Sequence, residues 1–376
     1  MQNADVLIIG AGIAGASLAW RLARGGHRVL LLEREAQPGM HSTGRSAAMF
    51  MQSYGPPGVR ALTRAGRDFY LNPPAGFADA PLLSPRAALF VATAAQHGAL
   101  VALGDTLAAS GTPLRHLDEA QLLTWAPALR PGLFAEALLD EGGFDMDVDR
   151  LLQGFLRGAR QAGAQLRTGV APGRAEHDGA GWRVALSDGT AAQATVVVNA
   201  AGAWADEVAA LFGAAPIGLE PRRRSAFTFR PPPGVDWSAT AMVCDVDEAW
   251  YFTPDAGQML GSPANADPTT AHDVQPDEFD IALGIHRLQE VSSFDIARPG
   301  ATWAGLRSFV ADGDLVIGFD DTCPGFFWLA AQGGYGIQSA AGASLLAASL
   351  IEGAPLPPEL AAQGVEPAVV SPRRLR

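Results

Sequence analysis

Hydrophobic residues near the start of the chain follow the order expected of a strand, a helix and a second strand. Residues 5–9 form a nearly continuous apolar run, which is typical of a strand buried on both faces. Apolar residues then recur at helical spacing over residues 13–24, and two glycines follow as a stop signal. A second apolar run, residues 28–32, ends at Glu33. The pattern predicts a buried strand, a helix and a second buried strand in succession.

The turn between the first strand and its helix carries three glycines, Gly10, Gly12 and Gly15. At this spacing the first permits a tight turn, the second lets backbone approach a pyrophosphate, and the third lets the helix pack closely on the sheet. Glu33 stands where a carboxylate accepts hydrogen bonds from an adenosine ribose, and an acid there disfavours a 2′-phosphate. A glycine-rich turn without a ligand is the alternative, but the complete ordered unit favours FAD or NAD.

The hydrophobic pattern becomes irregular between residues 56 and 139. This stretch is rich in proline and alanine, and its helical patterns at residues 60–70 and 118–125 are short, so we expect an insertion. Regular patterning then returns, with a helix predicted at residues 145–162, a hairpin at 182–189 and a buried strand at 194–199.

A second departure from the opening pattern spans residues 217–298. Short strand-like segments separated by proline-rich turns predict antiparallel strands at residues 225–229, 241–244, 250–253 and 259–261. The chain then returns to apolar segments at residues 303–309, 315–319 and 326–330, followed by a glycine-rich turn at 333–338 and an alanine-rich helix predicted at 339–351. Residues 353–376 are proline-rich and polar, and we expect an irregular tail.

Composition narrows the setting. The net charge is −12, which disfavours a nucleic-acid partner because such binding needs a basic surface. Two cysteines suit a reducing cytoplasm, and seven histidines without ligand spacing predict no metal site. Glycines interrupt the apolar stretch at residues 6–20, so we expect no export or transmembrane segment. Peripheral membrane association, as a route to a quinone, stays open.

All 27 basic residues are arginine, and the chain contains no lysine. This composition excludes a Schiff-base mechanism, a lysine-linked cofactor and a lysine general base. A genome of high GC content is the simple explanation for the bias, but the chemical restriction holds whatever its origin.

Five motifs occur in one order along nearly the whole chain: GAGIAG with Glu33, HSTGRSAA at residues 41–48, NAAGAWAD at 199–206, GLRSF at 305–309 and GGYGIQ at 333–338. Together they resemble the FAD-dependent D-amino acid oxidase and dehydrogenase family, and most closely its bacterial D-arginine dehydrogenases. The resemblance implies an α/β fold with a discontinuous Rossmann-like FAD-binding domain (GR2-type) and an α+β substrate domain with a mixed or antiparallel sheet. The implied FAD-binding segments are 1–50, 145–215 and 300–352, the substrate-binding segments are 51–144 and 216–299, and the tail is 353–376.

The resemblance also implies the cofactor contacts. FAD is expected to be noncovalent, because neither Cys244 nor Cys323 falls at the position that resembles a cysteine attachment site. N–H groups at the glycine-rich turn before the last long helix would stabilise the reduced, anionic flavin. The implied FAD-binding residues are Gly10, Gly12, Ile13, Ala14, Gly15, Glu33, Arg34, His41, Ser42, Thr43, Gly44, Arg45, Ser46, Ala47, Ala48, Val170, Ala201, Gly202, Trp204, Arg307, Gly333, Gly334, Tyr335, Gly336, Ile337 and Gln338.

An amino acid substrate needs a clamp for its carboxylate, and the planar fork of arginine suits that group. By resemblance the substrate site comprises Tyr54, Arg224, Tyr251, Arg307, Gly334 and Gln338. From the residues alone, Arg222 or Arg223 remains an alternative to Arg224. Solvation of this basic cluster, and core packing of the two tyrosines, are the competing interpretations.

The chain departs from the D-arginine dehydrogenases at the side-chain pocket. Ala88 stands where an acid receives the basic substrate side chain, Met49 replaces a histidine, and Met51 replaces a threonine. With Met242 and Cys244 these residues predict an apolar, adaptable pocket. We therefore expect D-amino acids with apolar or aromatic side chains to be preferred over D-arginine.

The implied reaction is hydride transfer from Cα of the substrate to flavin N5, giving an imino acid that water hydrolyses to a 2-keto acid and ammonia. The missing lysine favours a quinone or another carrier over oxygen as electron acceptor, although oxidase activity stays open. Alternatives are oxidation of glycine, sarcosine or D-proline, and a flavoprotein subunit of a larger complex. An RNA-acting flavoprotein is disfavoured by the negative charge.

Overall fold

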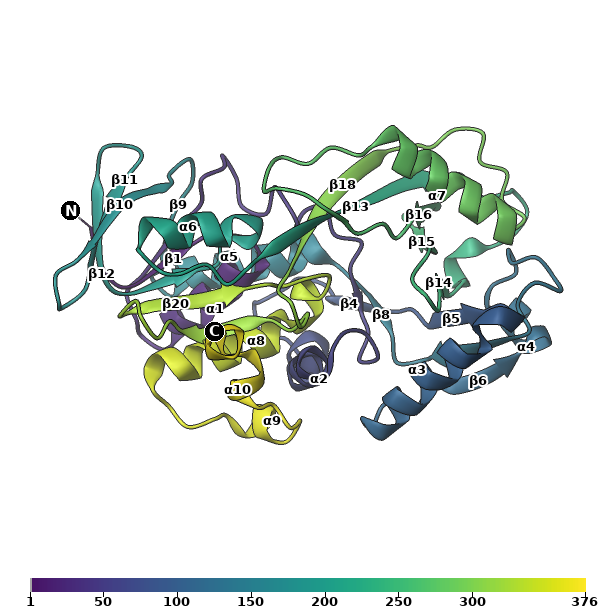
Figure 1. Ribbon diagram of the computed structural model, residues 1–376, viewed down its shortest axis with the longest axis horizontal. Coiled ribbons are helices and arrows are strands. Elements are labelled where there is room, and N and C mark those ends of the chain that lie inside the picture. The colour runs from purple at the N-terminus through teal and green to yellow at the C-terminus, as the bar shows by residue number, and fades with distance from the viewer. Residues whose placement is uncertain (1) are drawn as a thin grey trace.

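The computed structural model describes residues 2–376 and places two large sheets toward opposite ends of the long axis (Figure 1). Within those residues the first sheet has eight strands, in the order β10-β11-β12-β1-β2-β9, with β20 on β12 and β19 on β20. Its strands are β1 (Gln2–Ile9), β2 (Val29–Leu32), β9 (Gln165–Arg167), β10 (Pro172–His177), β11 (Trp182–Leu186), β12 (Ala191–Asn199), β19 (Val316–Phe319) and β20 (Phe326–Ala330).

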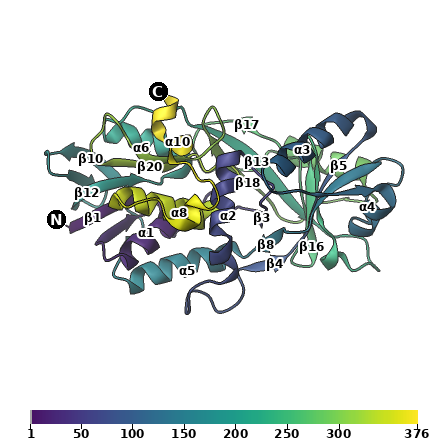
Figure 2. The same cartoon turned by 90° about the horizontal axis from the view of Figure 1, so that it is seen from below.

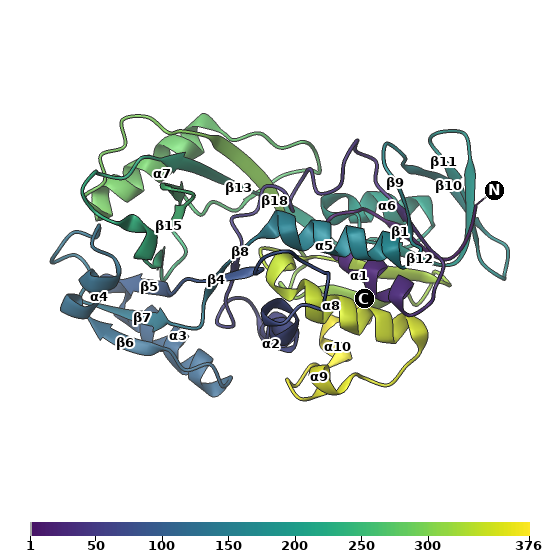
Figure 3. The same ribbon diagram turned by 180° about the vertical axis from the view of Figure 1, so that it is seen from behind.

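The centre of this sheet is parallel, as the apolar runs predict. β1 pairs in parallel with both β2 and β12, and β12 pairs in parallel with β20. The predicted hairpin is confirmed, because β11 runs antiparallel to β12. On one face lie α1 (Ile13–Arg24), α5 (Val148–Gln161) and α8 (Gly336–Glu352) (Figure 3), and α6 (Ala205–Leu211) contributes to the hydrophobic core of the other face.

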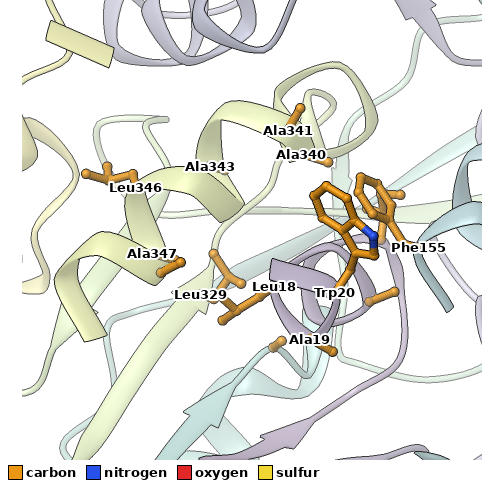
Figure 4. Close-up of a cluster of buried hydrophobic side chains, with 14 of the residues drawn as sticks. Leu18, Ala19, Trp20, Phe155, Leu329, Ala340, Ala341, Ala343, Leu346 and Ala347 are labelled. Atoms are coloured by element: carbon orange, nitrogen blue, oxygen red, sulfur yellow. The ribbon is translucent and has the colours of Figure 1, made fainter. Parts of the chain in front are cut away.

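Packing between α1 and its neighbours centres on Trp20 (Figure 4). Its ring meets that of Phe155 edge-on, with centroids 5.6 Å apart. A Cβ at Gly158 would lie 2.6 Å from the Trp20 ring, so only glycine allows α5 to approach α1 this closely. The resulting core fixes the N-terminus of α1, where the glycine turn emerges from the sheet.

The second sheet is mixed. Within residues 2–376 it has nine strands, in the order β17-β13-β16-β15-β14-β5-β7-β6 with β18 on β13, and its only parallel pair there is β14 with β5. Helix α7 (Glu278–Val291) packs on β13 and β16. The strands are β5 (Ala88–Ala92), β6 (Arg115–Asp118), β7 (Glu136–Asp140), β13 (Glu220–Phe229), β14 (Met242–Asp245), β15 (Tyr251–Asp255), β16 (Gln258–Ser262), β17 (Asp267–Pro268) and β18 (Thr302–Phe309).

A small third sheet and five further α-helices complete the fold within residues 2–376. Strands β3 (Met49–Phe50), β8 (Phe144–Met146) and β4 (Leu83–Pro85) form the small sheet. The remaining helices are α2 (Pro57–Leu71), α3 (His97–Ala109), α4 (Glu119–Trp125), α9 (Pro358–Ala361) and α10 (Pro367–Val370). In the part of the chain that the structure describes, no helix is long and apolar enough to cross a membrane.

Two predicted helix starts are wrong by three residues. The helix predicted from residue 145 begins at Val148, because Asp145 pairs with β3 and Asp147 caps the helix by accepting a hydrogen bond from Arg150 N. The helix predicted from residue 339 begins at Gly336, so the glycine-rich turn supplies its first residues.

The expectation of an irregular C-terminal tail is also wrong. After Glu352 the chain forms α9, α10 and a final 3₁₀ turn. Leu360 and Val370 are buried in the same core as α1 and α8, and Arg374 Nε donates to Asp312 at 2.7 Å. Proline and polar residues conceal this packing in the sequence because the buried side chains are few and widely spaced.

Two elements lie elsewhere than the predicted segments imply. β18 falls in the predicted FAD-binding segment that begins at residue 300, yet it pairs with β13 along its length in the second sheet. α2 falls in a predicted substrate-binding segment, yet it lies next to α8 (Figure 2), where Tyr70 Oη donates to Ile337 O at 2.7 Å. Strand pairing and packing therefore cross the predicted segment boundaries, and the division into domains stays a prediction.

Candidate functional site

One cavity extends from the start of α1 to the start of α8 and is bounded on its far side by the second sheet. It encloses about 1570 Å³, part of it open to solvent. The structure brings many of the predicted site residues to its wall: Gly12, Ile13, Ala14, Ser42, Thr43, Arg45, Ser46, Ala47, Ala48, Met49, Met51, Tyr54, Gly202, Arg224, Met242, Cys244, Tyr251, Arg307, Gly333, Gly334, Gly336, Ile337 and Gln338. Segments far apart in sequence thus share one space.

The glycine turn has the geometry that its spacing predicts. Gly10 has φ +102°, and a Cβ there would lie 2.4 Å from Ala200 O. A Cβ at Gly15 would lie 1.9 Å from Gly10 O, so the helix can pass this close to the strand only without a side chain. Gly12 caps α1 without a side-chain hydrogen bond. The positive end of the helix therefore faces the cavity, where it suits a phosphate.

Glu33 holds the end of β2 against this turn. Its Oε2 accepts a hydrogen bond from Ala11 N at 3.0 Å, and its Oε1 accepts one from Glu35 N at 3.0 Å. Val170 N donates to the Glu33 carbonyl at 2.9 Å, which brings this predicted adenine neighbour beside the carboxylate. Neither Glu33 nor Val170 lines the cavity, and the ribose site stays a prediction.

Other predicted cofactor residues also gather outside the cavity wall. The guanidinium of Arg34 lies 3.8 Å from the centroid of the Trp204 ring, and the His41 ring contacts the same ring at a tilt, with centroids 4.7 Å apart. The predicted residues that do not line the cavity are Gly10, Gly15, Glu33, Arg34, His41, Gly44, Ala88, Val170, Ala201, Trp204 and Tyr335.

The loop at residues 41–48 forms hydrogen bonds both to α1 and to the second sheet. Thr43 Oγ1 accepts from Ile13 N at 3.0 Å, and Ser42 Oγ donates to Leu306 O on β18 at 2.6 Å. Arg45 forms an ion pair with Asp273 and donates to Val274 O at 2.7 Å. With the start of α1 and the glycine turn, these short side chains offer the donors and the close approach that a pyrophosphate needs, so the residues present fit FAD.

Two arginines on paired strands line the cavity side by side. In the β13–β18 ladder Arg224 lies opposite Gly305, and Arg307 lies opposite Arg222, which makes Arg224 and Arg307 diagonal neighbours on one face. Arg307 Nη1 donates to Tyr54 Oη at 3.2 Å, and Arg224 Nε donates to Asn265 O at 2.6 Å. Gly305, which has no side chain, leaves the space between them open.

Burial shapes the electrostatics of this pair. It lowers the pKa of Arg224, and the nearby positive charge of Arg307 lowers it further. Burial also raises the pKa of Tyr54 above its ordinary value, so its hydroxyl stays protonated. Two guanidiniums that share an enclosed space attract an anion, and a carboxylate matches their fork geometry.

The structure distinguishes the three consecutive arginines of β13. Arg224 lines the cavity. Arg223 donates to Asp280 at 2.9 Å, and Arg222 donates to Glu220 at 2.6 Å outside the cavity. Because side chains alternate along a strand, Arg223 points to the opposite face of the sheet from Arg222 and Arg224. Arg222 shares the face of Arg224 but is partly exposed to solvent.

Gln338 serves to position other residues. It is 3% exposed, its Nε2 donates to Tyr54 O and to Thr63 Oγ1, both at 3.2 Å, and its Oε1 accepts from Met51 N at 3.3 Å. Gly334 leaves room for the Arg307 guanidinium, because a Cβ there would lie 2.8 Å from Arg307 Nη1. The start of α8 therefore holds both the tyrosine and the arginine.

The apolar part of the cavity differs from the prediction at one position. Met49, Met51, Met242 and Cys244 line it as expected, and burial raises the pKa of the Cys244 thiol. Ala88 does not line it, because that residue is completely buried in β5. Phe90, two residues along on the same strand face, lines the cavity instead. Where the resemblance implies an acidic residue, this chain has the buried Ala88, and the aromatic ring of Phe90 forms that part of the cavity wall.

Sequence reasoning missed four polar residues of the cavity wall: Glu248, Thr253, Ser308 and Gln332. Thr253 Oγ1 and Gln332 Nε2 are buried without a hydrogen-bond partner among residues 2–376. A second cavity of about 1710 Å³ adjoins the first and shares the segment 46–49, Thr253 and Trp303 with it. The sequence indicates a short turn between β14 and β15, which contains Glu248. It does not indicate that the Glu248 side chain lies at the cavity wall, because that depends on the backbone conformation of the turn.

Known proteins share this architecture. A family model described as FAD dependent oxidoreductase matches residues 5–350. FAD-dependent oxidoreductase domain-containing protein 1 of Mus musculus is 26% identical over 393 residues, covering 91% of this chain and 80% of its own. Glycine oxidase of Geobacillus kaustophilus (strain HTA426) is 25% identical over 374 residues, covering 93% of each chain.

A solved structure supports the same fold. The crystal structure of L-proline dehydrogenase from P. horikoshii superposes with a TM-score of 0.86 at 19% identity, covering 99% of this chain and 98% of that chain. At this identity the likeness concerns the fold. It agrees with the predicted nucleotide-binding sheet joined to a mixed sheet.

Proposed function

Because the chain belongs to the FAD-dependent oxidoreductase family, we propose that it oxidises D-amino acids to imino acids, which water hydrolyses to 2-keto acids and ammonia. Noncovalently bound FAD would supply the oxidant that accepts a hydride from the substrate Cα. The observation that carries the proposal is the enclosed pair Arg224 and Arg307, with Tyr54 bonded to Arg307 at 3.2 Å, in the cavity that begins at the α1 glycine turn.

The clamp would bind the substrate carboxylate. Arg307 and Arg224 offer paired N–H donors, and each hydrogen bond to a charged group contributes roughly 1.5–3 kcal/mol. Tyr54 and Tyr251 would position the same carboxylate through their hydroxyls. A carboxylate held at several points fixes the orientation of Cα, which a reaction at that carbon requires.

Proton handling needs no strongly basic side chain if the amine binds neutral or loses its proton on binding. Tyr54 would act as a donor rather than a base, since burial raises its pKa. The N–H groups at the start of α8 would face the cofactor ring and stabilise negative charge on it.

The apolar wall supports a preference for apolar or aromatic side chains over D-arginine. Met49, Met51, Met242 and Phe90 offer hydrocarbon and sulfur contacts, and methionines adapt to different shapes. A guanidinium beside Ala88 would have no acid there to neutralise it, and an unpaired buried charge costs several kcal/mol. The electron acceptor we favour is a quinone or another carrier.

A second candidate is the oxidation of glycine or of a small secondary amine or imino acid. It is supported by the similarity to a protein named glycine oxidase and to a structure named L-proline dehydrogenase. Its substrates would use the same carboxylate clamp and would leave the apolar wall largely unused.

Anaerobic mixing tests the proposal. The purified holoprotein is mixed with D- and L-leucine, methionine, phenylalanine and arginine, and with glycine, sarcosine and D-proline, while the flavin absorbance is followed. Bleaching by apolar D-isomers and not by L-isomers supports the proposal. Bleaching only by glycine or secondary amines supports the second candidate, and faster bleaching by D-arginine contradicts the proposed preference.

A further inference from the structure

The turn between β14 and β15 is rigidly held, and it brings Glu248 to the cavity wall. Asp245 Oδ2 accepts hydrogen bonds from Asp247 N at 3.0 Å and from Ala249 N at 3.2 Å. Gln96 Nε2 donates to Asp245 at 2.9 Å and to Asp247 at 2.8 Å, which ties the turn to the start of α3. The direction of Glu248 is therefore set by the surrounding backbone.

Glu248 itself has a strained backbone. Its φ is +54°, in the left-handed region that residues other than glycine, asparagine and aspartate rarely adopt. Among residues 2–376 its carboxylate forms neither a side-chain hydrogen bond nor an ion pair within 4.0 Å. Glu248 is exposed to solvent at the cavity wall, so its charge is available to a molecule that enters there.

The charge of Glu248 acts on the clamp from a distance. Glu248 lines the same cavity as Arg224 and Arg307. Burial alone would lower the pKa of Arg307, but Tyr54, Tyr251 and Glu248 together raise it, and Glu248 also opposes the lowering of the pKa of Arg224. Two guanidiniums alone would attract a dicarboxylate as readily as a monocarboxylate. A carboxylate on the same cavity wall would instead repel a second anionic group after the first has been bound.

We propose that Glu248 is a specificity-determining residue that rejects substrates carrying a second carboxylate. The inference rests on the proposed function, because it needs one substrate carboxylate to occupy the clamp of Arg224 and Arg307. It deepens that function by excluding acidic amino acids. It also places an acid in the cavity although position 88 has none.

Ligand binding tests this inference without requiring turnover. Succinate and succinamate have nearly the same shape and differ by one negative charge, so the ratio of their dissociation constants isolates charge selectivity. We expect the wild-type holoprotein, followed by the change in its flavin spectrum, to bind succinamate about tenfold more tightly than succinate. Glu248→Gln should bring the ratio close to one, mainly by tightening succinate binding.

A neighbouring acid provides the matched control. Asp247→Asn removes the same charge from the same turn, but Asp247 does not line the cavity, so the selectivity should stay at the wild-type ratio. Glu248→Asn is a second variant, because asparagine tolerates the left-handed backbone and keeps the test valid should the glutamine variant fold poorly. Turnover of D-glutamine relative to D-glutamate should change in the same direction.

The outcomes separate the two proposals. If both ligands bind and neither Glu248 variant changes the ratio, the role of Glu248 is overturned while the clamp stands. If neither ligand perturbs the flavin of the wild-type holoprotein, the clamp itself is contradicted, and with it the proposed function and the inference that rests on it. If Asp247→Asn changes the ratio as much as Glu248→Gln, the selectivity reflects the general charge of the turn and the assignment to Glu248 is wrong.

Discussion

Gln338 Nε2 donates a hydrogen bond to the backbone carbonyl of Tyr54 at 3.2 Å, while the hydroxyl of that tyrosine accepts one from Arg307 at 3.2 Å. The first helical turn of α8 therefore reaches the proposed carboxylate clamp through one tyrosine. Because Gln338 is almost completely buried, water cannot readily replace its contacts.

Gln338→Leu should weaken substrate binding more than it weakens the chemical step. Loss of the amide frees Tyr54 and leaves buried polar groups unpaired, at a cost of about 1–3 kcal/mol in the free energy of unfolding. We expect KM to rise roughly tenfold, measured by steady-state kinetics on the holoprotein. Thr63→Val is the control, since it removes one partner of Gln338 and leaves the bond to Tyr54. Equal effects of both variants would contradict a role through Tyr54.

Arg307→Lys keeps the positive charge and removes the planar fork. We expect substrate binding to weaken by about 1.5–3 kcal/mol, which corresponds to roughly 10- to 150-fold in KM. Arg222→Lys on the paired strand is the matched control, because its guanidinium bonds to Glu220 outside the cavity. A lysine at 307 that binds substrate as well as arginine would exclude bidentate recognition of the carboxylate there.

Gly10→Ala should impair FAD binding more severely than its backbone conformation alone explains. Gly10 and Gly26 have similar φ values, +102° and +89°, but a Cβ at Gly10 would lie 2.4 Å from Ala200 O, whereas at Gly26 nothing lies within 4 Å. Flavin content per chain after purification measures the difference. Gly26→Ala should be destabilised by about 1 kcal/mol and keep its flavin. Similar flavin loss in both variants would mean that the steric contact is irrelevant.

Both thiols should be unreactive in the folded protein at mildly alkaline pH. Burial raises the pKa of Cys323 to about 11 and that of Cys244 further, so at pH 8 about one Cys323 in a thousand is a thiolate. Titration with a thiol reagent at pH 8 should detect neither cysteine in the native protein and both after unfolding. Rapid modification of one thiol in the native state would show that its site opens to solvent.

The elements set by local pattern were predictable. β1, the glycine turn and α1 follow from apolar runs and glycine spacing, and α1 has the predicted bounds, residues 13–24. Motif order indicates an FAD-dependent family, which the family match confirms. The assignment to D-arginine dehydrogenases stays a prediction, because the similarities found extend to glycine oxidase and proline dehydrogenase.

Features that depend on long-range pairing were not predictable from the same patterns. The direction of Glu248 depends on a turn held by Gln96 from another element. The contact of α2 with α8 depends on Gly342, where a Cβ would lie 2.1 Å from Leu62 O. Neither residue stands out in hydrophobic patterning, because each matters through a neighbour far away in the sequence.

The diagonal placement of Arg224 and Arg307 has a consequence for how this site can vary. Their separation is a property of the β13–β18 backbone ladder, whose repeat is fixed by hydrogen bonding. Inserting or deleting a single residue in either strand would turn one guanidinium to the opposite face of the sheet. Residues of the apolar wall can be substituted one at a time without moving the two arginines. Substrate preference can therefore change in evolution while the proposed carboxylate clamp is retained.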